Sequence, residues 1–148
     1  MRLLIQRVSR ASVRVDGSEV GAIGQGLVVL VGVGHDDTPA IARQMAAKAI
    51  ELRIFRDGEG KTNLALADVG GAVLAVSQFT LFADTSRGRR PSFLGAAPPA
   101  LGEQLYDEFA RAIEERGVTV ARGVFGAEME VELVNDGPLT IWLDSAAR

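Results

Sequence analysis

The chain has 148 residues, 47% of them hydrophobic and 24% charged, which predicts one soluble globular domain over residues 1–148. It contains no cysteine, which excludes disulfides and thiolate chemistry and suits the cytoplasm. No apolar run approaches the length of a membrane span, and we expect no signal peptide because no small-residue cleavage site follows the start. The net charge of −3 argues against a basic surface overall but is compatible with a local basic patch.

The first half of the chain predicts strands followed by a helix. We expect two short strands within residues 2–15, a turn at Asp16-Gly17 and a buried strand over LVVLVGV. A helix follows, capped by Asp37 or Thr38, with Pro39 near its first position. The segment RDGEGK predicts a turn, and AVLAVSQFTL predicts the next buried strand.

The second half adds one more helix and a strand pair. Four apolar residues repeat every four positions within the predicted helix: Leu101, Leu105, Phe109 and Ile113. The segment AEMEVELV alternates and predicts a half-exposed strand, NDGP predicts a turn, and LTIWL predicts the last strand. The whole chain therefore predicts a strand-rich α/β domain with mixed or antiparallel sheets and two main helices.

Several common kinds of active site are disfavoured by the sequence. His35 is the one histidine; it lies beside two aspartates at a turn, and nothing places it near a serine, so we interpret it as a turn residue. One histidine with scattered carboxylates is a poor metal-ligand set, and we expect neither metal nor cofactor. The glycine-rich segments match neither the phosphate-loop nor the dinucleotide pattern.

Polar residues end the apolar run at 72–76, where Ser77, Gln78, Phe79 and Thr80 follow. If the strand continues, Gln78 and Thr80 share one side and face one ligand, whereas Phe79 packs on the other side. An amide, a hydroxyl and main-chain N–H groups are the donors from which an oxyanion hole is built. The alternative is that neighbouring carbonyl groups in the core satisfy these polar side chains.

These residues carry a resemblance to a known family. The segments LIQRVSRASV, RIFRDGEGKTNL, VSQFTLFADTSRGRRPSF, LYDEF and VNDGPLTIWL resemble the D-aminoacyl-tRNA deacylases (the D-Tyr-tRNA deacylase family) in order and spacing. Ser-Gln-Phe-Thr and Asn-x-Gly-Pro-x-Thr are the two signatures of that family, and both are intact. Without the resemblance, the Gly-Pro pair predicts only a tight turn.

The resemblance implies a homodimer of β/β/α-layered subunits with the active site at the subunit interface. Ser77, Gln78, Phe79 and Thr80 then line the ester-binding pocket of one subunit, and Gly137-Pro138 of the partner subunit, in the cis form, reaches into it.

The resemblance also implies roles for three further side chains. Arg7 holds the Gly-Pro carbonyls in orientation and places the chain in the main family, not in the related group with a trans Gly-Pro. Phe125 and Met129 match positions that contact the terminal adenosine. The alternative for this pair is packing around the last hairpin.

The implied activity is hydrolysis of the ester that joins a D-amino acid, or glycine, to tRNA, with rejection of L-aminoacyl-tRNA. Water is the expected nucleophile. Thr80 as a covalent nucleophile is the rival mechanism, and it ranks lower because no side-chain base is visible to activate its hydroxyl. Arg87, Arg89 and Arg90 either contact the tRNA backbone or form a solvated loop. The alternative functions are a non-catalytic tRNA- or nucleotide-binding module and a hydrolase of free amino-acid esters.

Overall fold

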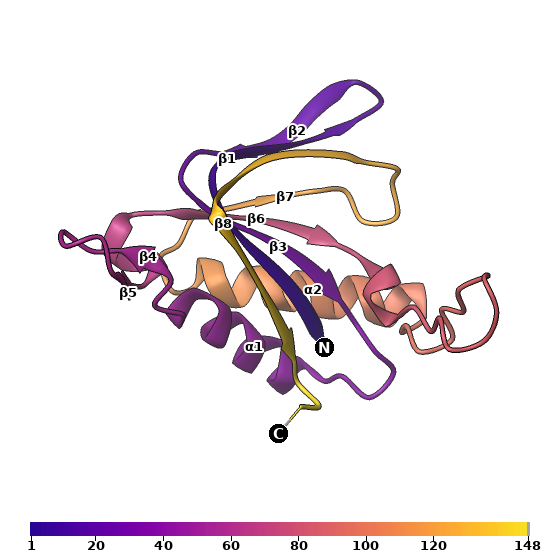
Figure 1. The fold of residues 1–148 in the computed structure, drawn as a ribbon. Coiled ribbons are helices and arrows are strands. Elements are labelled where there is room, and N and C mark those ends of the chain that lie inside the picture. Colours follow the sequence, from indigo (N-terminus) through magenta and orange to yellow (C-terminus); the bar gives the residue numbers. More distant parts are fainter. Residues whose placement is uncertain (148) are drawn as a thin grey trace.

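The computed structural model describes residues 1–147, and its sheet is organised around one long strand, β1 (Arg2–Val15). This strand pairs antiparallel with β3 (Gly26–Gly32) along its first half and with β2 (Ser18–Ile23) along its second half. The last strand, β8 (Glu130–Asp144), covers the other edge of β1 (Figure 1). The prediction of two short strands here is wrong, because pairing with β8 along both halves keeps β1 continuous.

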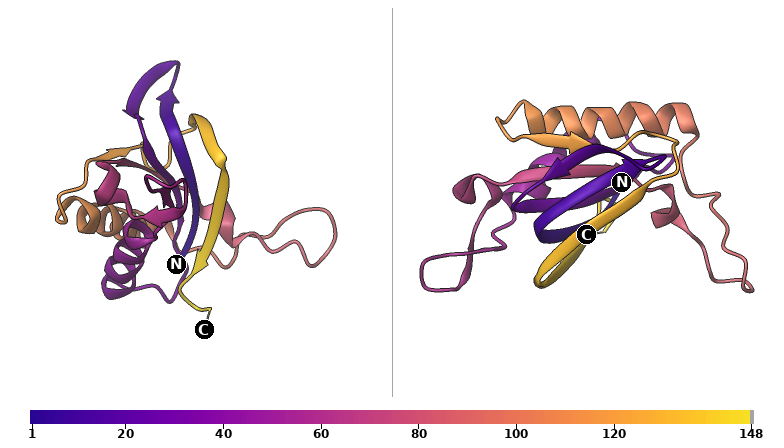
Figure 2. Two further views of the ribbon diagram at one scale, coloured as in Figure 1. Left: turned by 60° about the vertical axis from the view of Figure 1, so that its left-hand side comes forward. Right: turned by 90° about the horizontal axis from the view of Figure 1, so that it is seen from above.

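Two strands extend the sheet beyond β3 in parallel: β6 (Ala72–Ser77) pairs with β3, and β7 (Val120–Arg122) pairs with β6. Parallel neighbours need a crossover connection, which the helices α1 (Pro39–Glu51) and α2 (Pro99–Glu114) supply. Figures 1 and 2 show both helices on the same side of the sheet. The predicted mixed α/β fold with two helices on one side is thus confirmed.

Helix α1 begins where its sequence predicts. Thr38 is the N-cap, its hydroxyl accepting a hydrogen bond from the backbone N–H of Ile41 at 3.2 Å, and Pro39 occupies the first helical position. A proline there loses no hydrogen bond, since the first N–H groups of a helix have no partner within the helix. Within the described residues, no helix combines the length and the apolar character that crossing a membrane requires.

The core lies in two layers. One cluster fills the space between the sheet and the helices, and Leu105, Phe109 and Ile113 on the predicted apolar face of α2 are completely buried in it. A smaller cluster covers the opposite face of the sheet, where Val28 and Leu74 pack with the second half of β1, such as Val13, and with the first half of β8, such as Leu133. The sheet therefore folds back over itself above the helices, in agreement with the β/β/α layers that the resemblance implied.

Strand β6 ends at Ser77, so the predicted strand over AVLAVSQFTL is wrong in its last four residues. The backbone N–H of Gln78 donates to the carbonyl of Val31 at 2.8 Å, and the chain then turns into the 3₁₀ helix η2 (Phe79–Phe82). The partner strand β3 ends at Gly32, and a Cβ there would lie 3.0 Å from the Cβ of Leu81. The turn therefore packs directly over Gly32. Side-chain alternation along residues 72–81 gives no sign of this contact.

The segment NDGP is not a turn between two strands but a bulge within β8. Asn135 pairs with Val8 and Thr140 pairs with Gln6, so residues 136–139 all lie opposite Arg7. Both strands bend sharply at this point (Figure 1), as strands do at bulges. Beside the bulge lies a small hairpin of β4 (Phe55–Arg56) and β5 (Thr62–Leu64), closed by the predicted turn of residues 56–61.

Candidate active site

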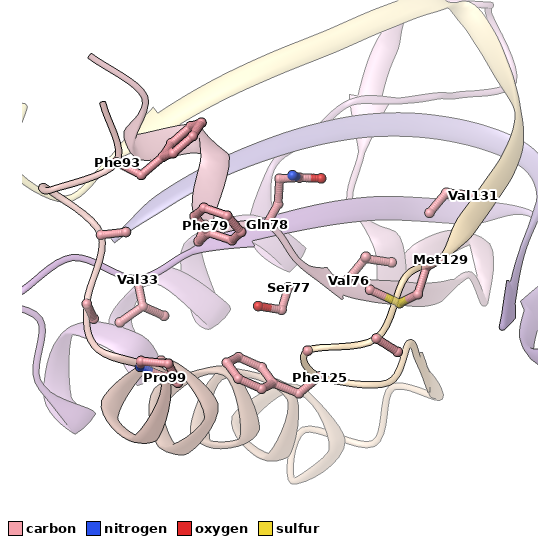
Figure 3. A pocket seen from close by; sticks show the side chains of 15 residues that line it. Val33, Val76, Ser77, Gln78, Phe79, Phe93, Pro99, Phe125, Met129 and Val131 are labelled. Carbon is pink, nitrogen blue, oxygen red and sulfur yellow. The ribbon is translucent and has the colours of Figure 1, made fainter. Parts of the chain in front are cut away.

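A cavity of about 570 Å³ opens between the end of β6, the start of α2 and the segment that leads into β8 (Figure 3). The hydroxyl of Ser77 points into it, and Phe125 and Met129 lie on its far side (Figure 3). Its walls are mainly apolar, as in most small-molecule sites. The residues that line it include Val33, Val76, Ser77, Gln78, Phe79, Phe93, Ala97, Pro99, Phe125, Met129 and Val131.

Phe79 stands at the mouth of this cavity and is 56% exposed. The expectation that Phe79 packs in the core is wrong, because the residue lies on the η2 turn and not on the inner side of a strand. Its ring meets that of Phe93 edge to face, with the centroids 5.2 Å apart. Two aromatic rings at the mouth offer flat apolar surfaces for a base or a substrate side chain.

Gln78 and Thr80 do lie together, but the turn brings them together and not strand alternation. The side-chain amide of Gln78 donates a hydrogen bond to the hydroxyl of Thr80. Gln78 lines the cavity, whereas Thr80 is exposed beside it. Their partial exposure argues against the alternative that both are polar groups satisfied inside the core.

The backbone at the start of η2 has unused donors. The first N–H groups of a helical turn have no partner within it, and Gln78 at the cap position supplies no side-chain hydrogen bond to them. Among the described residues, the N–H groups of Phe79 and Thr80 donate to no other backbone carbonyl. Two adjacent free N–H groups on the turn beside an apolar cavity are donors of the kind from which an oxyanion hole is built.

Phe125 and Met129 line the far wall and also pack against the fold. The ring of Phe125 is 6.3 Å from that of Tyr106 on α2, and the sulfur of Met129 lies over Gly123, where a Cβ would be 2.6 Å away. The predicted packing of this pair is therefore seen, and both residues also line the cavity, whereas their contact with an adenosine stays a prediction. Tyr106 was not predicted, and it supports this wall from below by donating to the carbonyl of Ala75 at 2.8 Å.

The Gly137-Pro138 bulge is fixed by a buried arginine. Arg7 is 4% exposed; its Nη1 donates to the carbonyl of Ile54 at 2.6 Å and its Nε to the carbonyl of Asp136 at 3.0 Å. The Gly137-Pro138 peptide bond is cis. A Cβ on Gly137 would lie 2.8 Å from Nη2 of Arg7, so the guanidinium lies directly against this glycine.

Two further side chains, those of Asn135 and Asp136, hold the bulge. The side-chain amide of Asn135 donates to the carbonyls of Arg7 and Leu139, both at 2.9 Å. The carboxylate of Asp136 binds Arg56 of the small hairpin, with Nη1 3.0 Å and 3.2 Å from its two oxygens. Arg56 was not predicted, and a sequence read one segment at a time gives no signal for a contact between residues so far apart.

Comparison with known proteins decides the family. The sequence model described as D-Tyr-tRNA(Tyr) deacylase matches residues 4–144. The chain belongs to this family. As a family member it is an ester hydrolase acting on aminoacyl-tRNA, and the resemblance seen in the sequence is confirmed.

Relatives of this deacylase agree over their full length. A protein named D-aminoacyl-tRNA deacylase from Thermomicrobium roseum is 60% identical over 99% of this chain and 95% of its own length. One of the same name from Deinococcus radiodurans is 56% identical over 97% of this chain and 99% of its own length. A solved structure of a protein named c-Myc DNA Unwinding Element Binding Protein is 39% identical, with a TM-score of 0.93 over 99% of this chain and all of that one.

The fold brings only part of the predicted deacylase site together within one chain. Ser77, Gln78 and Phe79 share the cavity with Phe125 and Met129, whereas Arg7, Gly137 and Pro138 line no part of it. Phe93, which sequence reasoning missed, completes the mouth. It lies directly after the arginine-bearing segment, and no pattern in the sequence connects it with Phe79.

The remaining polar groups near the cavity have structural partners. Nε2 of His35 lies 2.7 Å from the carbonyl of Leu94, which fits the predicted turn residue. Burial raises the pKa of Tyr106 to about 12, so its phenol stays protonated and serves as a hydrogen-bond donor. Across residues 1–147, no group of three or more histidine, aspartate or glutamate side chains is placed to hold a metal ion.

Proposed function

We propose that the chain hydrolyses the ester bond between a D-amino acid and the 3′-terminal adenosine of tRNA, releasing free D-amino acid and tRNA in the cytoplasm. The observation that carries this proposal is the pair of free N–H groups of Phe79 and Thr80 at the edge of the apolar cavity. The names of the relatives at 56% and 60% identity support the choice of substrate.

Hydrolysis needs few groups, because an aminoacyl ester is already activated. Water adds to the carbonyl carbon, and the negative charge that forms on the carbonyl oxygen is stabilised by the N–H groups of Phe79 and Thr80. Each such donor contributes about 2.7–4 kcal/mol in known oxyanion holes. The C–O bond then breaks, and the ribose oxygen leaves with a proton.

Water remains the preferred nucleophile over the hydroxyl of Thr80. The group that contacts this hydroxyl is the side-chain amide of Gln78, and a carboxamide does not act as a base at neutral pH. An unactivated hydroxyl is a weak nucleophile. We therefore assign Gln78 the role of orienting the hydroxyl of Thr80.

We infer that the active enzyme is a homodimer in which the bulge at the partner subunit's Gly137 closes the cavity. Three observations support this. The bulge is exposed and lies away from the cavity of its own chain, so that it is available to another. Strand β8 pairs only with β1 among the described strands, which leaves its outer edge open. Three large apolar side chains of β8 are exposed: Val131, Val134 and Trp142.

The proposed dimer explains selection by handedness. If the partner subunit's Gly137 and the partner subunit's Pro138 present their carbonyls to the substrate ammonium, the amine and the ester are both fixed. A D side chain then points to the open side, whereas an L side chain collides with the backbone. Because the side chain itself is hardly contacted, many D-amino acids and glycine should be accepted.

The test is deacylation of matched D-Tyr-tRNA and L-Tyr-tRNA by the purified protein. We expect release of D-Tyr to be faster by orders of magnitude, and equal rates for the two substrates would refute the proposal. Glycyl-tRNA serves as the third substrate and should be cleaved.

A non-catalytic nucleic-acid-binding module is the second candidate. The name of the structural relative at 39% identity, c-Myc DNA Unwinding Element Binding Protein, favours it. This candidate predicts that tRNA is bound and that no ester is lost, and the same assay therefore separates the two functions.

A further inference from the structure

A loop with three arginines projects from the molecule beside the cavity. Residues 84–92, hereafter the arginine loop, extend away from the sheet at the end opposite the β4–β5 hairpin (Figures 1 and 2). Its base is closed by two backbone hydrogen bonds between Asp84 and Ser92, of 2.7 Å and 2.9 Å. Every residue from 84 to 91 is exposed, so packing against the domain does not explain the loop.

The charges of this loop are not used within the chain. Arg87, Arg89 and Arg90 form no ion pair with any residue from 1 to 147. By contrast, the exposed Arg43 on α1 contacts two carboxylates of α2 and its C-terminal turn. Asp84 is the one acid of the loop, and its carboxylate accepts the backbone N–H of Ser86 instead. A chain with a net charge of −3 thus holds an unneutralised positive cluster at one place.

The base of the arginine loop is joined to the wall of the cavity. Phe93 follows the loop directly, and its ring contacts that of Phe79 at the mouth. The next residues are held by a hydrogen bond between Leu94 and His35 and by one from the N–H of Ala97 to the carbonyl of Val33 at 2.8 Å. The base of the arginine loop therefore borders the cavity, and a long ligand whose reactive end fills the cavity can extend beside these arginines.

We propose that the arginine loop binds backbone phosphates of the tRNA just beyond its terminal adenosine. This inference rests on the proposed function and adds a site to it. A loop of this length can extend roughly 13 Å from its base, which is enough to reach nucleotides that precede the terminal adenosine. Guanidinium groups match phosphate oxygens in a bidentate geometry.

The composition of the loop limits what it can recognise. Between residues 84 and 92 there is no aromatic side chain on which a base could stack and no asparagine or glutamine; arginines can contact guanine edges as well as phosphates, and in the proposed complex these three contact phosphates. Contacts to phosphates alone set position and affinity without sequence information. The loop should therefore strengthen binding of all tRNAs alike.

The test compares two charge-neutralised triple variants. The first carries Arg87→Gln, Arg89→Gln and Arg90→Gln. The control carries Lys48→Gln, Lys61→Gln and Arg111→Gln, which removes the same charge from exposed positions on the helices and the β4–β5 hairpin. Each is assayed on D-Tyr-tRNA and on D-Tyr esterified to adenosine, which has no phosphodiester, at 50 mM and 200 mM salt.

We expect the loop variant to lose activity on D-Tyr-tRNA at low salt through a higher KM, and to keep wild-type activity on the adenosine ester. Its plot of log kcat/KM against log salt should be shallower by about 2, since each phosphate contact to a single strand contributes about 0.7. The advantage of the wild type over the loop variant should then shrink about 20-fold between 50 mM and 200 mM salt. The control variant should match the wild type.

Three outcomes would overturn the inference: equal salt slopes for loop variant and wild type, equal losses in loop and control variants, or equal losses on both substrates. If the wild-type protein cleaves neither ester, the proposed function fails. If the wild type cleaves D-Tyr-tRNA and the loop variant does so equally well at low salt, the arginine loop inference alone fails.

Discussion

Replacing Arg7 with methionine should remove the support of the Gly-Pro bulge. The side chain is 4% exposed and donates to two backbone carbonyls, those of Ile54 and Asp136. Hydrogen bonds from a charged donor contribute about 1.5–3 kcal/mol each, and methionine can make neither of them. We therefore expect the free energy of unfolding to fall by about 3–6 kcal/mol, the sum of the contributions of the two hydrogen bonds.

Arg10→Met provides the matched control on the same strand. Each arginine lies beside an acid of β8: Nε of Arg7 is 3.3 Å from a carboxylate oxygen of Asp136, and Nη1 of Arg10 is 3.2 Å from one of Glu132, but the Arg10 side chain is 64% exposed. Exposed ion pairs contribute about 0.2–1 kcal/mol, so this variant should be nearly neutral. Urea unfolding followed by circular dichroism measures both changes. If Arg7→Met costs no more than Arg10→Met, the bulge is held by other contacts and the reasoning is refuted.

Three further predictions concern the cavity and its support. Thr80→Val should keep kcat within about tenfold, the size of one neutral hydrogen bond; a loss near 10⁶-fold, typical of a missing covalent nucleophile, would contradict the water mechanism. Gly123→Ala forces the side chain of Met129 to move, because the new Cβ would lie 2.6 Å from its sulfur. This variant should have a lower kcat/KM for D-Tyr-tRNA and should lose about 1–3 kcal/mol of stability. Gly58→Ala, where no atom lies within 4 Å of the new Cβ, is its control, and equal effects of the two would count against the packing argument. Burial raises the pKa of Tyr106 from 10.0 to about 12. The stability that this shift contributes is therefore complete below pH 10 and lost as the pH rises to about 12, which urea midpoints should show; a Tyr106→Phe variant with the same alkaline slope would contradict it.

Local signals predicted the helices well. Thr38 and Pro39 mark the start of α1 because capping and a fixed φ angle act within a few residues. The four-residue repeat that contains Leu105 and Phe109 identified the buried face of α2, since a helix that covers a sheet needs one apolar side. Both features depend on neighbours in sequence, which is why they could be read from it.

The end of β6 could not be predicted in this way. A run of apolar and polar residues continues through Phe79 and Thr80, and side-chain alternation alone cannot tell a strand from a 3₁₀ turn. What decides it is the end of the neighbouring strand at Gly32, which lies far away in the sequence. The same holds for the bulge in β8, because its length is defined only by the register with Val8 and Gln6 on β1.

The family resemblance drew on residues that the physical patterns did not connect. It named Phe125 and Gly137 as parts of one site, although within one chain Phe125 lines the cavity and Gly137 does not. Arg56 and Phe93 were missed for a different reason. Their roles come from single side-chain contacts, with Asp136 and with Phe79, that only the folded chain reveals.

The contacts around the bulge connect two regions with different tasks. Arg7 ties the backbone before β4 to the bulge, and Arg56 within β4 holds the carboxylate of Asp136 from outside. The small hairpin is therefore tied to the Gly-Pro segment through Arg7 and Arg56. In the proposed dimer, the hairpin of one subunit thus helps to position the backbone that selects the enantiomer in the other subunit's active site. Substitution of Arg56, although this residue lines no part of the cavity, would then alter which enantiomer the neighbouring site accepts.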